Sequence, residues 1–151
     1  VPVWISVLFI MVFYVLTTKT SLGRFIYAIG GNEKAAQVSG VPIQKVKWIV
    51  YALSGAMAAI GGVLVTSRLN SAQPNAGINY ELDAIAAIVI GGTSLSGGQG
   101  SVKGTIIGAI LIGVLNNGLV LLNVSPFWQQ VVKGLVILLA VIVDKMNQKA
   151  K

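Results

Sequence analysis

The sequence predicts an all-α integral membrane protein with about five transmembrane segments and one short cytoplasmic helix, and two observations carry that prediction. Hydrophobic residues make up 55% of the 151 residues and charged residues only 10%, which is far from the composition of soluble domains. Apolar runs of about 20 residues, the length that crosses a bilayer core, recur along the whole chain. We therefore expect a single transmembrane domain over residues 1–151, embedded in a lipid bilayer.

Composition also excludes several kinds of chemistry. The chain has no cysteine and no histidine, which rules out disulfides, thiolate or imidazole metal ligands and a Ser-His-Asp arrangement. The net charge of +7 comes from basic residues that flank the apolar runs, where they orient a protein in a bilayer and do not indicate nucleic acid. The chain begins at Val1 inside an apolar run, so we expect it to be a fragment of a longer protein.

Five segments are apolar enough to cross a membrane, and they lie at residues 1–18, 48–66, 84–102, 105–124 and 127–143. The third segment contains a cluster of glycines, namely Gly91, Gly92, Gly97, Gly98 and Gly100. We expect this helix to be broken, and buried in protein or lining a cavity, because unpaired backbone groups cannot face lipid. Asp83 would mark its outer end and Lys103 its inner end, with all four acidic residues of the chain outside the membrane core.

The connections between these segments predict the orientation. The connection over residues 19–47 carries five basic residues and one acid, whereas residues 67–83 carry one basic residue and two acids. The positive-inside rule places the first connection and the basic C-terminal tail in the cytoplasm. If the third segment were a re-entrant loop, the tail would finish outside, so a true crossing is favoured.

A short polar helix is predicted in the first cytoplasmic connection. Asn32 suits the N-cap, Glu33 favours the positive end of a helix, and Gly40 suits the position just after the last turn. Pro42 can begin the next helix. A solvated turn is the alternative reading of this stretch.

Polar and small residues within the other segments indicate contacts. Asn116 and Asn117 lie near mid-membrane, where each could form an interhelical hydrogen bond or line a substrate path. They cannot share one role, because neighbouring residues point about 100° apart on a helix. Lys133 is interpreted as reaching back to the membrane surface. Small residues at Ser54, Ala58 and Gly62 predict close packing of the second segment against neighbours, or else a substrate-lining face.

Residues 95–99 read LSGGQ, which matches the signature sequence of ABC-type ATPases. Nucleotide hydrolysis also needs a phosphate-binding G-x-x-x-x-G-K-[ST] loop, and no glycine-lysine-Ser/Thr triplet occurs in the chain. Intramembrane proteolysis would need a basic partner for Ser94 or Ser96, or two aspartates at depth, and the sequence predicts neither. We therefore expect no catalytic residue, no metal site and no cofactor in this chain.

Several motifs occur together and in order, and they carry a resemblance. They are TSLGRFIYAIGGNEKAAQVSGV, YELDAIAA, GGTSL followed by SGGQG, and LNNGL. The chain closely resembles the membrane permease subunit of bacterial ABC-type monosaccharide importers, of which it would be the C-terminal half.

The resemblance implies a mechanism without covalent chemistry in this subunit. Two permease subunits, expected to be identical, would form the path through the bacterial inner membrane, with their C-termini in the cytoplasm. ATPase subunits in the cytoplasm would use ATP and Mg²⁺, and an extracytoplasmic binding protein would deliver the sugar. Ribose is the expected cargo, with xylose, galactose, another sugar or a branched-chain amino acid as alternatives. A secondary transporter is the competing class, in which an acid or histidine inside a span would couple an ion.

The resemblance also assigns a role to the short polar helix, as the coupling helix that seats in the ATPase: Asn32, Glu33, Lys34, Ala35, Ala36, Gln37, Val38, Ser39 and Gly40. Depth and polarity suggest a set of candidate path residues: Gly91, Gly92, Thr93, Ser94, Asn116 and Asn117. The connection expected to face the binding protein holds four further candidates: Gln73, Tyr80, Glu81 and Asp83.

Overall fold

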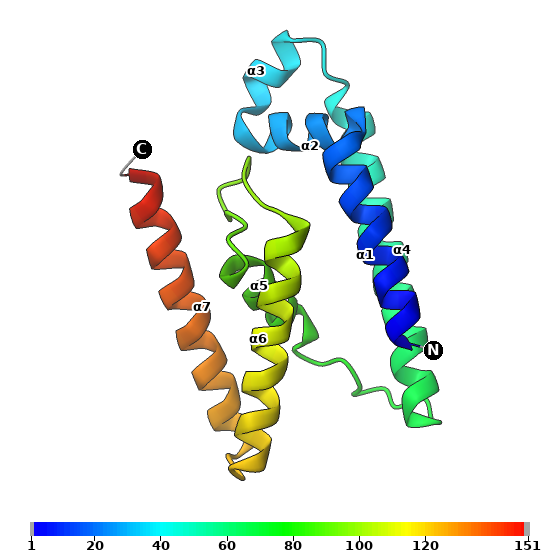
Figure 1. Ribbon diagram of the computed structural model, residues 1–151, viewed down its shortest axis with the longest axis vertical. Coiled ribbons are helices and arrows are strands. Elements are labelled where there is room, and N and C mark those ends of the chain that lie inside the picture. The colour runs from blue at the N-terminus through cyan, green and yellow to red at the C-terminus, as the bar shows by residue number, and fades with distance from the viewer. Residues whose placement is uncertain (1, 150–151) are drawn as a thin grey trace. The chain divides into compact units, whose positions relative to one another are not determined.

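The computed structural model describes residues 2–149, and all regular structure in that range is helical (Figure 1). The helices are α1 (Pro2–Lys19), α2 (Ser21–Gly31), α3 (Glu33–Val38), α4 (Ile43–Leu69), α5 (Tyr80–Ile90), α6 (Val102–Leu121) and α7 (Pro126–Lys149). The chain divides into two compact units, the first ending at Ile78 and the second beginning at Asn79.

Four of the described helices are long and apolar enough to cross a membrane, namely α1, α4, α6 and most of α7. The predicted segment 84–102 is different, because it is helical only as far as Ile90 and then forms turns up to Ser101. At 1.5 Å per residue the 11 residues of α5 span about 16 Å, roughly half of a bilayer core. The all-α class with about five apolar segments is confirmed.

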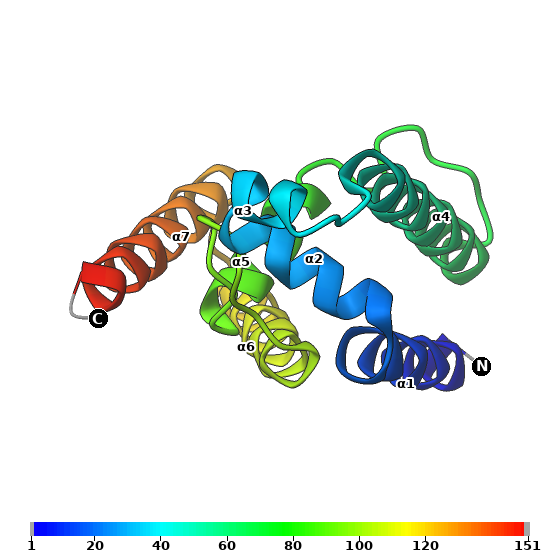
Figure 2. The same ribbon diagram turned by 90° about the horizontal axis from the view of Figure 1, so that it is seen from above.

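The first unit contains α1 to α4 and is organised around α2. Thr20 caps this helix by accepting a hydrogen bond from the Gly23 amide, and Figure 2 shows α2 running from the end of α1 to α3. The sequence analysis did not predict α2 as a separate helix. Its signal was present, because apolar residues recur with helical spacing at Leu22, Phe25, Ile26 and Ile29.

The long helices of the first unit bury little of their surface. The most apolar stretches of α1 and α4 contain no buried residue. Trp4 and Trp48 are 77% and 75% exposed. A groove of about 240 Å³ separates the two helices, and its lining is almost entirely apolar. Helices that are apolar all round require lipid or further protein segments around them.

The second unit is packed more tightly, with α5 in contact with both α6 and α7. Its core consists of Ala86, Ala87 and Ile112, against which Ile90 and Ile137 pack. Figure 1 shows α6 and α7 running in opposite directions from the tight turn that joins them. Asn123 adopts a left-handed conformation in this turn, with φ of 53°.

Candidate functional site

The short helix α3 has the predicted boundaries and caps. The Asn32 side chain accepts a hydrogen bond from the Ala35 amide at 3.0 Å, as an N-cap residue does. Gly40 follows the helix with φ of +82°, a conformation that favours glycine. The Val41 amide closes the end by donating to the Ala36 carbonyl at 3.1 Å. The start of α3 is also tied to α4, because Lys47 and Glu33 form an exposed ion pair at 2.7 Å.

The two faces of α3 differ in exposure. Ala36 is buried at 4%, whereas the neighbouring apolar residue Val38 is 90% exposed. Beside the helix lies an open hollow of about 360 Å³ with both polar and apolar lining, to which Glu33 and Gln37 contribute. An apolar side chain that protrudes from a polar helix next to a hollow can anchor a partner protein.

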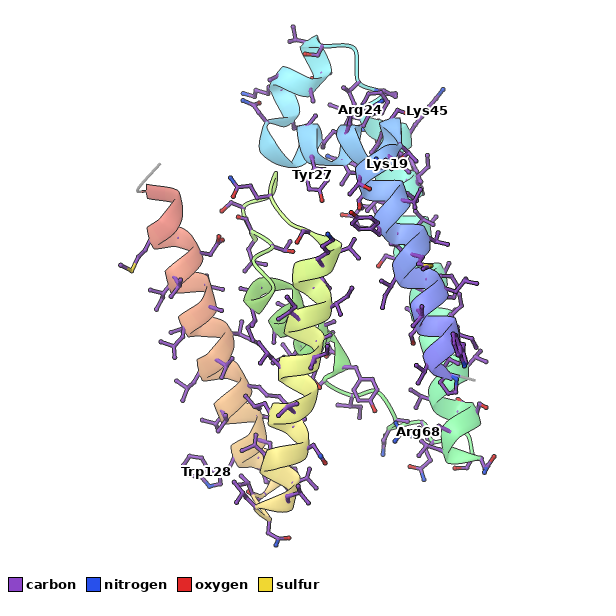
Figure 3. All side chains as sticks on the ribbon, viewed as in Figure 1. Lys19, Arg24, Tyr27, Lys45, Arg68 and Trp128 are labelled. Carbon is purple, nitrogen blue, oxygen red and sulfur yellow. The ribbon has the colours of Figure 1, made fainter. Side chains whose placement is uncertain are left out.

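Cationic residues gather at the α2 end of the first unit. Figure 3 shows Lys19, Arg24 and Lys45 at that end and Arg68 at the opposite end of α4. The first three residues lie in or beside the predicted cytoplasmic connection. This charge distribution is the one that the positive-inside rule associates with a cytoplasmic face.

Residues 91–101 form a compact loop in the second unit. Gly92, Gly97 and Gly98 have φ between 77° and 91°, which only glycine adopts readily. Ser94 is 6% exposed, and its hydroxyl donates to Asp144 Oδ2 of α7 at 3.1 Å and accepts from the Ser96 amide. The LSGGQ residues, 95–99, therefore lie in a loop that is held by contacts within this chain.

Glycines allow α5 and α6 to approach at backbone distance. A Cβ atom at Gly104 would overlap the carbonyl oxygen of Gly91, and one at Gly108 would overlap that of Ala87. Neither clash could be relieved by moving a side chain, because both involve backbone atoms. This glycine crossing fixes where α5 lies along α6.

The two predicted path asparagines have different surroundings. Asn116 donates from Nδ2 to Asp83 Oδ2 at 3.1 Å, and its buried Oδ1 has no hydrogen-bond partner among the described residues. Asn117 is exposed. Their different surroundings follow from the 100° step between neighbouring helical residues.

Asp83 makes contacts that the sequence did not predict. Its Oδ1 lies 2.8 Å from Lys133 Nζ, and the side chains of the pair are only 22% and 14% exposed. Both Asn116 and Lys133 belong to helices long enough to span a membrane. The position of Asp83 outside the membrane core stays a prediction. Lys133 pairs with Asp83, a contact that its interpretation as a residue reaching back to the membrane surface did not include. We call Asp83, Asn116 and Lys133 the polar trio.

The pairing of Asp83 with Lys133 was not predicted from the sequence, although the sequence contains one indication of it. A lone lysine within one apolar segment and a lone aspartate at the edge of another can neutralise each other. The other residues predicted to face a binding protein are exposed, namely Gln73, Tyr80 and Glu81. Gln73 belongs to the first unit, and Tyr80 and Glu81 belong to the second.

Comparison with known proteins identifies relatives. The chain is 58% identical over 145 residues to the ribose import permease protein of Bacillus subtilis, a match that covers 96% of the chain and 45% of the relative. It is 55% identical over 148 residues to the ribose import permease protein of Escherichia coli, covering 97% of the chain and 46% of the relative. The L-arabinose transport system permease protein of Escherichia coli is 47% identical over 150 residues, covering 99% and 46%.

The chain therefore spans a little less than half the length of these relatives, which agrees with its being part of a longer subunit. No solved structure matches it. Residues 3–141 match a family model described as the permease component of branched-chain amino acid transport systems. The chain belongs to this family of transport permeases.

Proposed function

We propose that the chain is part of the permease subunit of an ATP-binding-cassette importer that carries ribose across the bacterial inner membrane. The observation that carries the proposal is the 55–58% identity to ribose import permeases over nearly the whole chain. The xylose transport system permease protein of Haemophilus influenzae is 53% identical over 134 residues, and the L-arabinose permease is 47% identical. Ribose is therefore the first cargo to test, and the other sugars and branched-chain amino acids become outcomes of the uptake test.

The coupling role belongs to α3. The exposed Val38 and the hollow beside Glu33 and Gln37 support docking of a cytoplasmic ATPase, which would bind ATP and Mg²⁺. The cations at the α2 end support a cytoplasmic position for this region (Figure 3). The basic residues of the C-terminal tail support a cytoplasmic C-terminus by the same rule. A second copy of the subunit and an extracytoplasmic sugar-binding protein would complete the importer.

Transport would follow from a two-state equilibrium. Nucleotide binding would move the ATPase, α3 would follow it, and the spans would change between inward-facing and outward-facing arrangements. Changing the populations from about 1:99 to about 99:1 requires roughly 5.5 kcal/mol of differential binding. The loop residues Gly91, Gly92, Thr93 and Ser94, together with Asn116 and Asn117, are the candidates for the sugar path.

A cross-linking experiment tests the coupling role. In the full-length subunit, reconstituted with its ATPase and binding protein, a Val38→Cys variant should cross-link to the ATPase. Val38 is a better probe than Ala36, because a cysteine at the buried Ala36 position would be inaccessible. Ala76→Cys is the matched control, since Ala76 is exposed but lies outside the predicted cytoplasmic connection.

Uptake in the same vesicles tests the cargo. We expect ATP-dependent accumulation of labelled ribose together with cross-linking at Val38 and none at Ala76. Cross-linking with uptake of xylose, galactose or a branched-chain amino acid in place of ribose would change the proposed cargo. It would still support the proposed importer. Uptake that persists without ATP and without cross-linking would favour a secondary transporter.

A further inference from the structure

We propose that the polar trio is a lock that positions α5 for coupled transport, with Asp83 and Lys133 as positioning residues. Asp83 belongs to α5, Asn116 to α6 and Lys133 to α7, so one cluster joins the three helices of the second unit. The inference rests on the proposed function, because positioning α5 has a measurable effect only in a complex that transports.

The depth of the trio is the first argument. Lys133 lies seven residues into α7 from Pro126, or about 10 Å, and Asn116 lies five residues before the end of α6, or about 8 Å. Charged groups inside a membrane span are costly unless they are paired, and usually mark a functional site. The trio satisfies this condition, because Lys133 and Asp83 neutralise each other at 2.8 Å.

The shortness of α5 is the second argument. Residues 70–79 before it are not helical and the glycine loop 91–101 follows it, so α5 is held mainly by its side contacts. The glycine crossing fixes the end that carries Gly91, and the polar trio fixes the end that carries Asp83. Breaking the trio would therefore release one end of the helix whose other end leads into the candidate path loop.

The amide of Asn116 makes a charge reversal a fair test. Its Nδ2 donates to the Asp83 carboxylate, whereas its buried Oδ1 has no partner among the described residues. If the two charges were exchanged, the amide could turn over and present Oδ1 to a lysine at position 83. A lock based on charge pairing should therefore work in either polarity.

The experiment compares Asp83→Asn, Lys133→Gln and the exchanged double variant Asp83→Lys/Lys133→Asp in the full-length importer in proteoliposomes. The readout is ribose taken up per ATP hydrolysed, measured per assembled complex, since this ratio does not change when less protein folds. We expect each single variant to lose about tenfold and the exchanged pair to return to within about threefold of wild type. Lys145→Gln is the matched control, because Lys145 is an exposed lysine on the same helix.

Several results would overturn the lock. The lock is refuted if the single variants take up as much ribose per ATP as Lys145→Gln does. It is also refuted if the exchanged pair takes up no more ribose per ATP than the single variants. A loss confined to the amount of assembled complex would show that the trio serves folding alone. If the singles fail to assemble, the uncharged pair Asp83→Asn/Lys133→Gln decides, because it leaves no unpaired charge: full coupling refutes the lock, and a loss of about tenfold supports it.

The same experiment separates the two proposals. A wild-type complex that moves no ribose under ATP refutes ribose import. The lock is refuted only when the variants are compared with a wild-type complex that transports ribose.

Discussion

The glycines of α4 in the first unit and those in the first half of α6 in the second unit have different surroundings. In α4 of the first unit, a Cβ atom added at Gly55, Gly61 or Gly62 would meet nothing within 4 Å. In the second unit, a Cβ atom at Gly104 or Gly108 would overlap the backbone of α5. Both sets look alike in the sequence, as small residues at helical spacing. Small residues at helical spacing therefore indicate that a helix can be approached closely, but they do not identify the segment that approaches. No segment of the first unit lies close to Gly55, Gly61 or Gly62 of α4.

The largest effect is expected at the glycine crossing. Gly108→Ala should destabilise the full-length subunit by about 3 kcal/mol, at the upper end of the usual cost of overpacking, because the clash is with a backbone carbonyl. The measurement is the thermal unfolding of the subunit in detergent. Gly113→Ala, on the same helix but with open space around its Cβ position, is the control. Equal melting of the two variants would show that the close approach of α5 at Gly108 does not limit the size of the residue there.

A smaller effect is expected where the glycine loop is tied to α7. Ser94→Ala removes the hydroxyl that donates to Asp144 and accepts from the Ser96 amide, so about 1–3 kcal/mol of local stability should be lost. Hydrogen exchange of the amides in residues 91–101 would show faster opening. Ser96→Ala is the control, because Ser96 is exposed and lies two residues away. Unchanged exchange in Ser94→Ala would mean that the loop is held by its backbone alone.

The smallest effect is expected in the first unit. Gly62→Ala should leave the melting of the full-length subunit unchanged or raise its stability by up to about 1 kcal/mol, because alanine is the better helix former and the site is open. The measurement is again thermal unfolding in detergent. A loss as large as that of Gly108→Ala would show that another segment of the subunit packs on this face of α4. In that case both sets of glycines would be close-packed, and they would differ only in the segment that packs against them.

Local features were predicted well from the sequence, because neighbouring residues determine them. The caps Asn32 and Gly40 lie next to the backbone groups that they satisfy, and the end of α5 coincides with Gly91, the first glycine of its cluster. The amphipathic helix α2 was missed because the whole connection was interpreted as a loop around one short helix. Its pattern from Leu22 to Ile29 was nevertheless readable.

Contacts between distant residues could not be predicted in this way. Lys133 and Asp83 are 50 positions apart, and nothing near Lys133 distinguishes pairing with an acid from reaching for the membrane surface. The depth of Asp83 depends on where α5 lies along α6, and the glycine crossing determines this position. A single sequence shows the glycines but not which backbone each one touches.

The ion pair between Asp83 and Lys133 has a consequence for biosynthesis. At about 5–20 residues per second, the ribosome adds Lys133 some 3–10 seconds after Asp83, because 50 residues separate them. During that interval the carboxylate lacks Lys133, the counter-charge with which it pairs in the complete fold. We expect α5 to wait at the membrane surface or beside the insertion machinery until α7 emerges, so that the last helix made completes the placement of α5.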